Sequence, residues 1–185
     1  MSIRSTKFSV AIALALASAA PAIAGTAVIV GGAPMYPTKN IIQNAVNSKD
    51  HTTLVAAVKA AGLVDTLEKP GPFTVFAPVN RAFEKLPKGT VKTLLKPENK
   101  GSLVKVLTYH VVPGRLSAMD LRAKVKAGGG KATLRTVEGD TLTVTEKGRR
   151  LEIVDEKGDM STITIPDVNQ SNGVIHVVDT VLLPK

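Results

Sequence analysis

The sequence contains no cysteine, which excludes a disulfide scaffold, a lipoprotein thiol, a cysteine nucleophile and any metal site built on thiolates. Tryptophan is also absent, and aromatic residues make up only 3% of the chain. Because single-stranded nucleic acid is held largely by stacking of bases on aromatic rings, this scarcity disfavours such a partner. Without disulfides, the stability of the fold must come from its hydrophobic core.

Histidine is scarce as well, since the chain has only His51, His110 and His176. A zinc site needs three or four ligands, and no HExxH motif or other close histidine spacing occurs. His110 and His176 could meet in space, but two ligands make a weak site. His51 lies just before a predicted helix, where we expect it to be exposed. The sequence therefore predicts no metal and no cofactor.

Motifs for nucleophilic catalysis and phosphate binding are missing too. No G-x-S-x-G elbow occurs, and both Ser102 and Ser117 stand where a helix N-cap would explain them. The run GGGK at 128–131 resembles part of a phosphate loop, but Ala132 occupies the position that requires Ser or Thr. Paired carboxylates remain an alternative, although most acidic residues fall in predicted exposed turns. The sequence thus favours a non-catalytic protein.

Long hydrophobic runs are confined to the first 24 residues. Arg4 and Lys7 precede a short apolar stretch, 8–20, and the small-x-small sequence AIA at 22–24. That order is typical of a secretory signal peptide, and the apolar part is shorter than the roughly 20 residues of a membrane-spanning helix. We predict cleavage after residue 24 and a secreted or periplasmic location, with no membrane span left after cleavage.

Positive charge is in excess, with a formal net charge of +9 at pH 7. Such an excess favours anionic partners such as acidic polysaccharide or lipid head groups. Four lysines recur at every fourth position: Lys88, Lys92, Lys96 and Lys100. Together with Lys105 they could form one basic patch. Pro97 interrupts the helix that would align them, so an ordinary solvated face is the simpler interpretation.

Hydrophobic periodicity changes from helical to strand-like at about residue 132. Residues 25–37 contain GGAPMYP, and we expect an irregular N-terminal arm there. Short helices are predicted between 38 and 125, around one strand, FTVFAP, at 73–78. The later predicted strands are 132–137, 141–146, 150–155, 160–166 and 174–183. This order predicts an α+β fold with a helical N-terminal half and an antiparallel meander.

Three segments together resemble the fasciclin (FAS1) domain family. TVFAPVNRAFEKLP at 74–87 matches the family's first motif, LTYHVVPGRL at 107–116 contains its Tyr-His pair, and SNGVIHVVDTVLLP at 171–184 matches its second motif. The resemblance spans roughly 40–184. It implies a seven-stranded β-wedge or sandwich, with 38–185 as a single domain. It also implies an extracellular or periplasmic role in cell adhesion and surface or matrix association, without enzymatic activity.

The histidine-containing motifs have two interpretations. In animal members of the family the Tyr-His region is associated with receptor binding, which makes Tyr109 and His110 candidate binding residues. Their sequence context favours burial instead, because His110 lies on the apolar face of its predicted helix and His176 on an apolar strand face. Loss of a hydrogen-bond partner for such a buried group would cost about 1–3 kcal/mol.

Three further motif residues are expected to have structural roles. Asn80 follows Pro78 and is expected to cap the helix that starts there. Asn172 and Gly173 have the chemistry of a left-handed turn that leads into the last strand.

The sequence therefore predicts a non-catalytic exported module that mediates cell adhesion or surface association. Its partner would be a cell-surface or extracellular macromolecule (a protein, an anionic polysaccharide or a lipid surface) and not a specific nucleic acid, and the module is expected to be a monomer. The alternative is a periplasmic carrier of a small apolar ligand or lipid, held in a cleft between sheet and helices. An unrecognised hydrolase is a third hypothesis, against which the missing nucleophile elbow argues.

Overall fold

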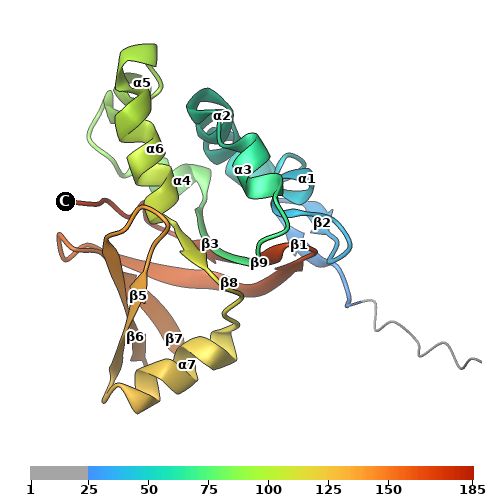
Figure 1. Ribbon diagram of the computed structural model, residues 1–185, viewed down its shortest axis with the longest axis vertical. Coiled ribbons are helices and arrows are strands. Elements are labelled where there is room, and N and C mark those ends of the chain that lie inside the picture. Colours follow the sequence, from blue (N-terminus) through green and yellow to red (C-terminus); the bar gives the residue numbers. More distant parts are fainter. Residues whose placement is uncertain (1–24) are drawn as a thin grey trace, which may run out of the picture.

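The structure is a computed structural model that describes residues 25–185, so the predicted signal peptide, 1–24, lies outside the described residues. The helices are α1 Ile41–Ala45, α2 Thr52–Ala61, α3 Val64–Glu68, α4 Asn80–Glu84, α5 Thr90–Leu94, α6 Lys100–Tyr109 and α7 Ala118–Ala127, with 3-10 turns η1 Lys49–His51 and η2 Pro97–Asn99. The strands are β1 Val28–Val30, β2 Ala33–Met35, β3 Phe73–Pro78, β4 Val111–Pro113, β5 Lys131–Arg135, β6 Thr141–Lys147, β7 Arg150–Val154, β8 Met160–Gln170 and β9 Gly173–Val178. Figure 1 shows α2, α3, α5 and α6 on one side of the molecule and α7 at the opposite end, beside β5, β6 and β7.

Seven strands form one mixed sheet in the order β4-β3-β9-β8-β7-β6-β5. The meander from β5 to β9 is antiparallel throughout, as predicted, whereas β3 and β9 pair in parallel. The Val137 amide donates to the Val111 carbonyl at 2.8 Å, so the segment after β5 also contacts β4 and the sheet is nearly closed. The predicted fold class, α+β with a seven-stranded wedge, is confirmed.

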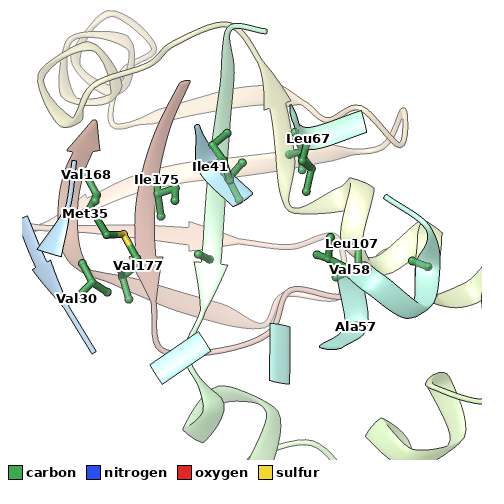
Figure 2. Packing of buried hydrophobic residues seen from close by; sticks show 14 of the residues in the cluster. Val30, Met35, Ile41, Ala57, Val58, Leu67, Leu107, Val168, Ile175 and Val177 are labelled. Carbon is green, nitrogen blue, oxygen red and sulfur yellow. The ribbon is translucent and has the colours of Figure 1, made fainter. Parts of the chain in front are cut away.

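Alternating side chains of β3 and β9 separate two hydrophobic cores. Val75 and Ala77 of β3 point into the core that the helices cover, here called the helix-side core. Phe76 points into the wedge core, which is enclosed by β5 to β8 and α7. On β9, Ile175 and Val177 join the helix-side core (Figure 2). Because both faces of these strands are buried, their polar side chains need partners inside the protein.

Local sequence explains several helix ends. Asn40 forms a capping box with Gln43 at the start of α1, and Ser117 forms one with Asp120 at the start of α7. The prediction for Ser117 is thus confirmed, whereas Ser102 lies inside α6 and does not cap it. Within residues 25–185, no helix combines the length and hydrophobicity that a membrane crossing requires.

The segment 25–37 is not the irregular arm that the sequence suggested, because it contains the antiparallel hairpin β1–β2. Gly31 and Gly32 have φ values of 57° and 76°, which form a tight turn between the two strands. Val30 and Met35 on either side of this turn are buried in the helix-side core. The expectation was wrong because a Gly-Gly pair is equally typical of a loop and of a hairpin turn. The apolar residues on both sides of the pair indicate the hairpin.

Candidate functional site

Tyr109, the last residue of α6, is completely buried. Its hydroxyl donates a hydrogen bond to the Thr141 carbonyl at 2.8 Å and accepts one from the Glu156 amide at 3.1 Å. Burial raises the pKa of the phenol to about 12, so the hydroxyl keeps its proton at neutral pH. The side chain therefore ties the end of α6 to β6 and to the turn after β7, and it exposes no surface to a partner.

His110 is also buried, and both of its ring nitrogens are in use. The Leu182 amide can only donate, so Nε2 is the acceptor of that bond, which measures 3.0 Å. Nδ1 must then carry the proton and donate it to the Val106 carbonyl at 2.8 Å. Burial lowers the pKa of the imidazole to about 4, which keeps the ring neutral at pH 7. With both nitrogens committed, the ring is free neither to ligate a metal nor to act as a base.

His176 is held in a similar way on β9. The Asp167 amide donates to Nδ1 at 3.3 Å, and Nε2 therefore donates to the Leu116 carbonyl at 2.8 Å. The ring stacks on Phe76, with ring centroids 5.8 Å apart, and burial lowers its pKa. The predicted burial of His110 and His176 is confirmed. Within residues 25–185, no group of three or more His, Asp or Glu side chains is arranged to hold a metal ion.

The expectation that His51 is exposed is wrong, since only 1% of its surface is accessible. The β1–β2 turn covers this segment, and the Lys49 amide donates to the Gly31 carbonyl at 3.2 Å. Nδ1 of His51 lies 2.9 Å from Ser48 Oγ, whereas Nε2 has no hydrogen-bond partner among the described residues. Burial lowers the pKa of His51. The backbone of Ala77 lies near the ring and raises the pKa by a smaller amount, although it forms no hydrogen bond with Nε2. The ring is therefore neutral at pH 7 and incompletely satisfied.

Asn80 caps a helix, but not the one that the sequence suggested. It is the first residue of α4, whose N-cap, Val79, makes no side-chain bond. Its carboxamide accepts a hydrogen bond from the Thr53 amide at 3.0 Å and donates one to the Lys49 carbonyl at 2.8 Å. Asn80 thus satisfies the start of α2, which has no side-chain cap from its own N-cap residue.

Asn172 connects three distant parts of the chain. Its side-chain oxygen accepts a hydrogen bond from the Ile41 amide at 3.0 Å. Its side-chain nitrogen donates to the carbonyls of Leu67 at 2.7 Å and Lys69 at 2.9 Å. The start of α1 and the end of α3 are therefore fixed to the turn that precedes β9.

Gly173 is required by a close contact and not by a left-handed backbone. The predicted left-handed turn is wrong, because among residues 25–185 neither Asn172 nor Gly173 has a positive φ. A Cβ atom at position 173 would lie 2.2 Å from the Phe73 carbonyl oxygen. The parallel pairing of β9 with β3 brings the two backbones too close for any side chain at this position.

An apolar cavity of about 70 Å³ lies between the sheet and helices α1, α2, α3 and α6. Its lining is formed mainly by aliphatic side chains, including Ile42, Val55, Leu63 and Leu107, and also includes His51. The cavity lies where the sequence suggested a cleft for an apolar ligand.

The lysines that the sequence suggested as one basic patch divide into two groups. Lys105 Nζ lies 3.7 Å from Glu138 Oε1 and 3.8 Å from Asp140 Oδ2. The others are exposed around α5 and η2: Lys88, Lys92, Lys96 and Lys100. Lys105 is therefore engaged with acidic residues of the wedge. The other four lysines are exposed on the helical side, where Lys96 Nζ lies 3.8 Å from Glu98 Oε1.

Comparison with protein families identifies a match over most of the described chain. The profile of the Fasciclin domain family matches residues 49–184. Protein sll1483 of Synechocystis sp. is 46% identical over 156 residues, which cover 84% of this chain and 79% of that protein. The immunogenic protein MPT70 of Mycobacterium tuberculosis is 34% identical over 145 residues, covering 76% of this chain and 66% of the relative.

Larger relatives and a solved structure share the same domain. The transforming growth factor-beta-induced protein ig-h3 of Sus scrofa is 37% identical over 131 residues, or 71% of this chain but 17% of that protein. A FAS1 domain pair from the insect cell adhesion molecule Fasciclin I superimposes with a TM-score of 0.72 at 21% identity. That match covers 80% of this chain and 52% of the domain pair, and it establishes the fold alone.

Proposed function

Because this chain belongs to the Fasciclin domain family, we propose that it is a non-catalytic, exported module that mediates cell adhesion or association with a cell surface or matrix. The observation that carries the proposal is that the polar side chains of the family motifs form hydrogen bonds inside the protein. The polar atoms of three motif side chains form hydrogen bonds with backbone groups inside the fold: Tyr109, His110 and His176. A partner would therefore be recognised on the surface, which carries the excess of lysine and arginine.

Two further features of the proposal follow from the sequence and the relatives. Removal of residues 1–24 would deliver a single domain, 38–185, with its N-terminal hairpin to the periplasm or outside the cell. The fold is shared with a protein named as a cell adhesion molecule, which supports a binding role. We propose that Tyr109 and His110 maintain the fold that presents the binding surface and do not contact the partner.

Retention of cells is the direct test of this function. The purified protein, immobilised on a surface, is expected to retain bacterial cells or cell-envelope fragments at low salt and to release them as salt screens the exposed charges. A monomeric protein of similar size and net charge, immobilised at the same density, is the control. The proposal fails if no cell or envelope surface is retained above this control at low ionic strength.

The apolar cavity supports a second candidate, a carrier of a small apolar ligand. At about 70 Å³, its volume is less than half of the roughly 150 Å³ of an engineered cavity that binds benzene. In this conformation it would therefore accept the end of an alkyl chain, and not a bulky ring system.

Native mass spectrometry of freshly purified protein tests the carrier hypothesis. A bound ligand would add a defined mass, and this addition should disappear in Val55→Phe, which places a ring in the cavity lining. Val154→Phe, at a half-buried position on β7 outside the cavity lining, should keep the ligand. Observation of the unmodified protein mass alone, also after incubation with a fatty acid, would exclude this candidate.

A further inference from the structure

A second concentration of positive charge lies at the end of the wedge where α7 ends, β5 begins and β6 turns into β7. We call this region the wedge tip and define it by seven basic residues: Arg122, Lys124, Lys126, Lys131, Lys147, Arg149 and Arg150. In Figure 1 the end of α7 lies at the same end of the wedge as the β6–β7 connection. These residues are distant in sequence from the lysines around α5, so the sequence pattern did not suggest this surface.

Strand register and hydrogen bonds bring the tip residues together. Lys147 lies opposite Arg150 in the β6–β7 hairpin, and Lys131 lies opposite Thr145, two residues before Lys147. Side chains at such positions are about 5–8 Å apart. Arg122 joins α7 to the same hairpin, because its Nη2 donates to the Arg149 carbonyl at 3.0 Å.

The positive charge of the tip is mostly unneutralised. No acidic residue occurs between Leu121 and Val137, and Glu152, which lies opposite Thr145 on β7, forms no salt bridge among the described residues. Glu146 is engaged by Arg122, with Nε 3.1 Å from Oε1. Among the described residues, none of the other six tip residues forms a salt bridge. Like charges at this density repel one another, and an anionic partner would relieve the repulsion.

The chemistry around the tip favours one class of anionic partner. The exposed large hydrophobic side chains of residues 25–185 are Ile29, Tyr36, Val46, Met119, Val137 and Met160. None belongs to the tip, so it has neither a group to insert into a membrane nor a ring on which a nucleic-acid base could stack. Thr133, Thr143 and Thr145 lie beside Lys131 on the outer face of β5 and β6, where their hydroxyls could bind sugar hydroxyls.

We propose that the wedge tip binds a linear acidic polysaccharide. Lys131, Lys147 and Arg150 would contact its carboxylate or sulfate groups, and the neighbouring threonines its hydroxyls. This inference rests on the proposed adhesion function, for which it specifies the surface and the class of partner.

The proposal is tested by measuring the affinity for immobilised heparin and polygalacturonate. Two variants that each lose three positive charges are compared with the wild-type protein. Lys131→Gln/Lys147→Gln/Arg150→Gln should weaken binding about tenfold, because it removes three solvent-exposed ion pairs between the protein and the polysaccharide. Lys88→Gln/Lys92→Gln/Lys100→Gln removes the same charge from exposed positions on the helical side and should change the affinity less than about twofold. Equal losses in the two variants would show that only net charge matters and would overturn the proposal, as would tighter binding to anionic vesicles or duplex DNA.

The cell-retention assay separates the failure of this inference from that of the function. If the wild-type protein retains cells and the tip variant retains them equally well, the tip is not the adhesive surface, although the module is adhesive. If the wild-type protein binds the polysaccharides but retains no cells, the adhesion function fails while the tip remains a polyanion site. Loss of both activities in the tip variant alone supports the two proposals together.

Discussion

Replacing Gly173 by alanine is expected to destabilise the protein by about 3 kcal/mol or more, the upper range for overpacking in a dense interior. The added Cβ would lie 2.2 Å from the Phe73 carbonyl oxygen and about 3.0 Å from its carbon. Both obstructing atoms belong to the backbone of β3, so no change of side-chain rotamer can relieve the contact. The strands β3 and β9 would have to separate where their parallel pairing begins.

Gly101→Ala provides a matched control, for which the expected change in stability has the opposite sign. Gly101 lies exposed near the start of α6, and a Cβ there would meet nothing within 4 Å. Alanine is favoured over glycine in a helix, so this variant should be more stable, by up to about 0.5–1 kcal/mol. Chemical denaturation of both variants measures the two effects. A Gly173→Ala protein as stable as the wild type would show that the two backbones are less constrained than this register implies.

Acidification from pH 7 to pH 5 is expected to remove about 2 kcal/mol of stability through His110 alone. The ordinary pKa of histidine is 6.5, and burial lowers that of His110 to about 4 in the folded protein. Between these values the unfolded chain binds a proton that the folded protein does not. The free energy of unfolding therefore falls as the pH drops below 6.5, and this contribution levels off below pH 4. Burial also lowers the pKa of His51 and His176, which adds to the effect in the same direction.

A His110→Gln variant isolates this contribution, because glutamine can both donate and accept a hydrogen bond but does not titrate. The difference in the free energy of unfolding between pH 7 and pH 5 should be smaller in the variant by about 2 kcal/mol, whatever its absolute stability. Staying above pH 5 avoids the carboxylates of Asp120 and Glu156, whose pKa values are lowered. If both proteins lose the same stability over this interval, His110 does not stay neutral in the folded state.

The candidate binding pair, Tyr109 and His110, illustrates what a motif can and cannot convey. The apolar face around His110 in the sequence correctly indicated burial, and the same reasoning applied to His176. The sequence did not indicate their partners, since Leu182 lies 72 residues from His110 and Leu116 lies 60 residues from His176. Such partners depend on which strands pair, and pairing is not encoded in local periodicity.

The asparagines show the same limit more clearly. Sequence reasoning expects an Asn or Ser at the start of a helix to cap that same helix. This rule succeeds at Ser117, whose partner is three residues away. It fails at Asn80, which caps a helix 27 residues earlier in the chain, and it gives no hint that Asn172 binds Ile41, 131 residues away. An unsatisfied helix end accepts any suitable group that the fold brings near it, whatever its distance in sequence.

The sequence by itself determined the α+β class, the strand FTVFAP at 73–78, the antiparallel meander and the resemblance to the fasciclin family. These features follow from periodicities of 3.6 and 2 residues and from short motifs, which are local properties of the chain. Only the tertiary structure decided that β3 and β9 run in parallel, that His51 is covered by the N-terminal hairpin, and that the basic residues of α7 and β5 meet those of the β6–β7 hairpin. Each of these features depends on contacts between segments that are distant in sequence. Such contacts are determined by the packing of the two hydrophobic cores and not by the local preferences of any one segment.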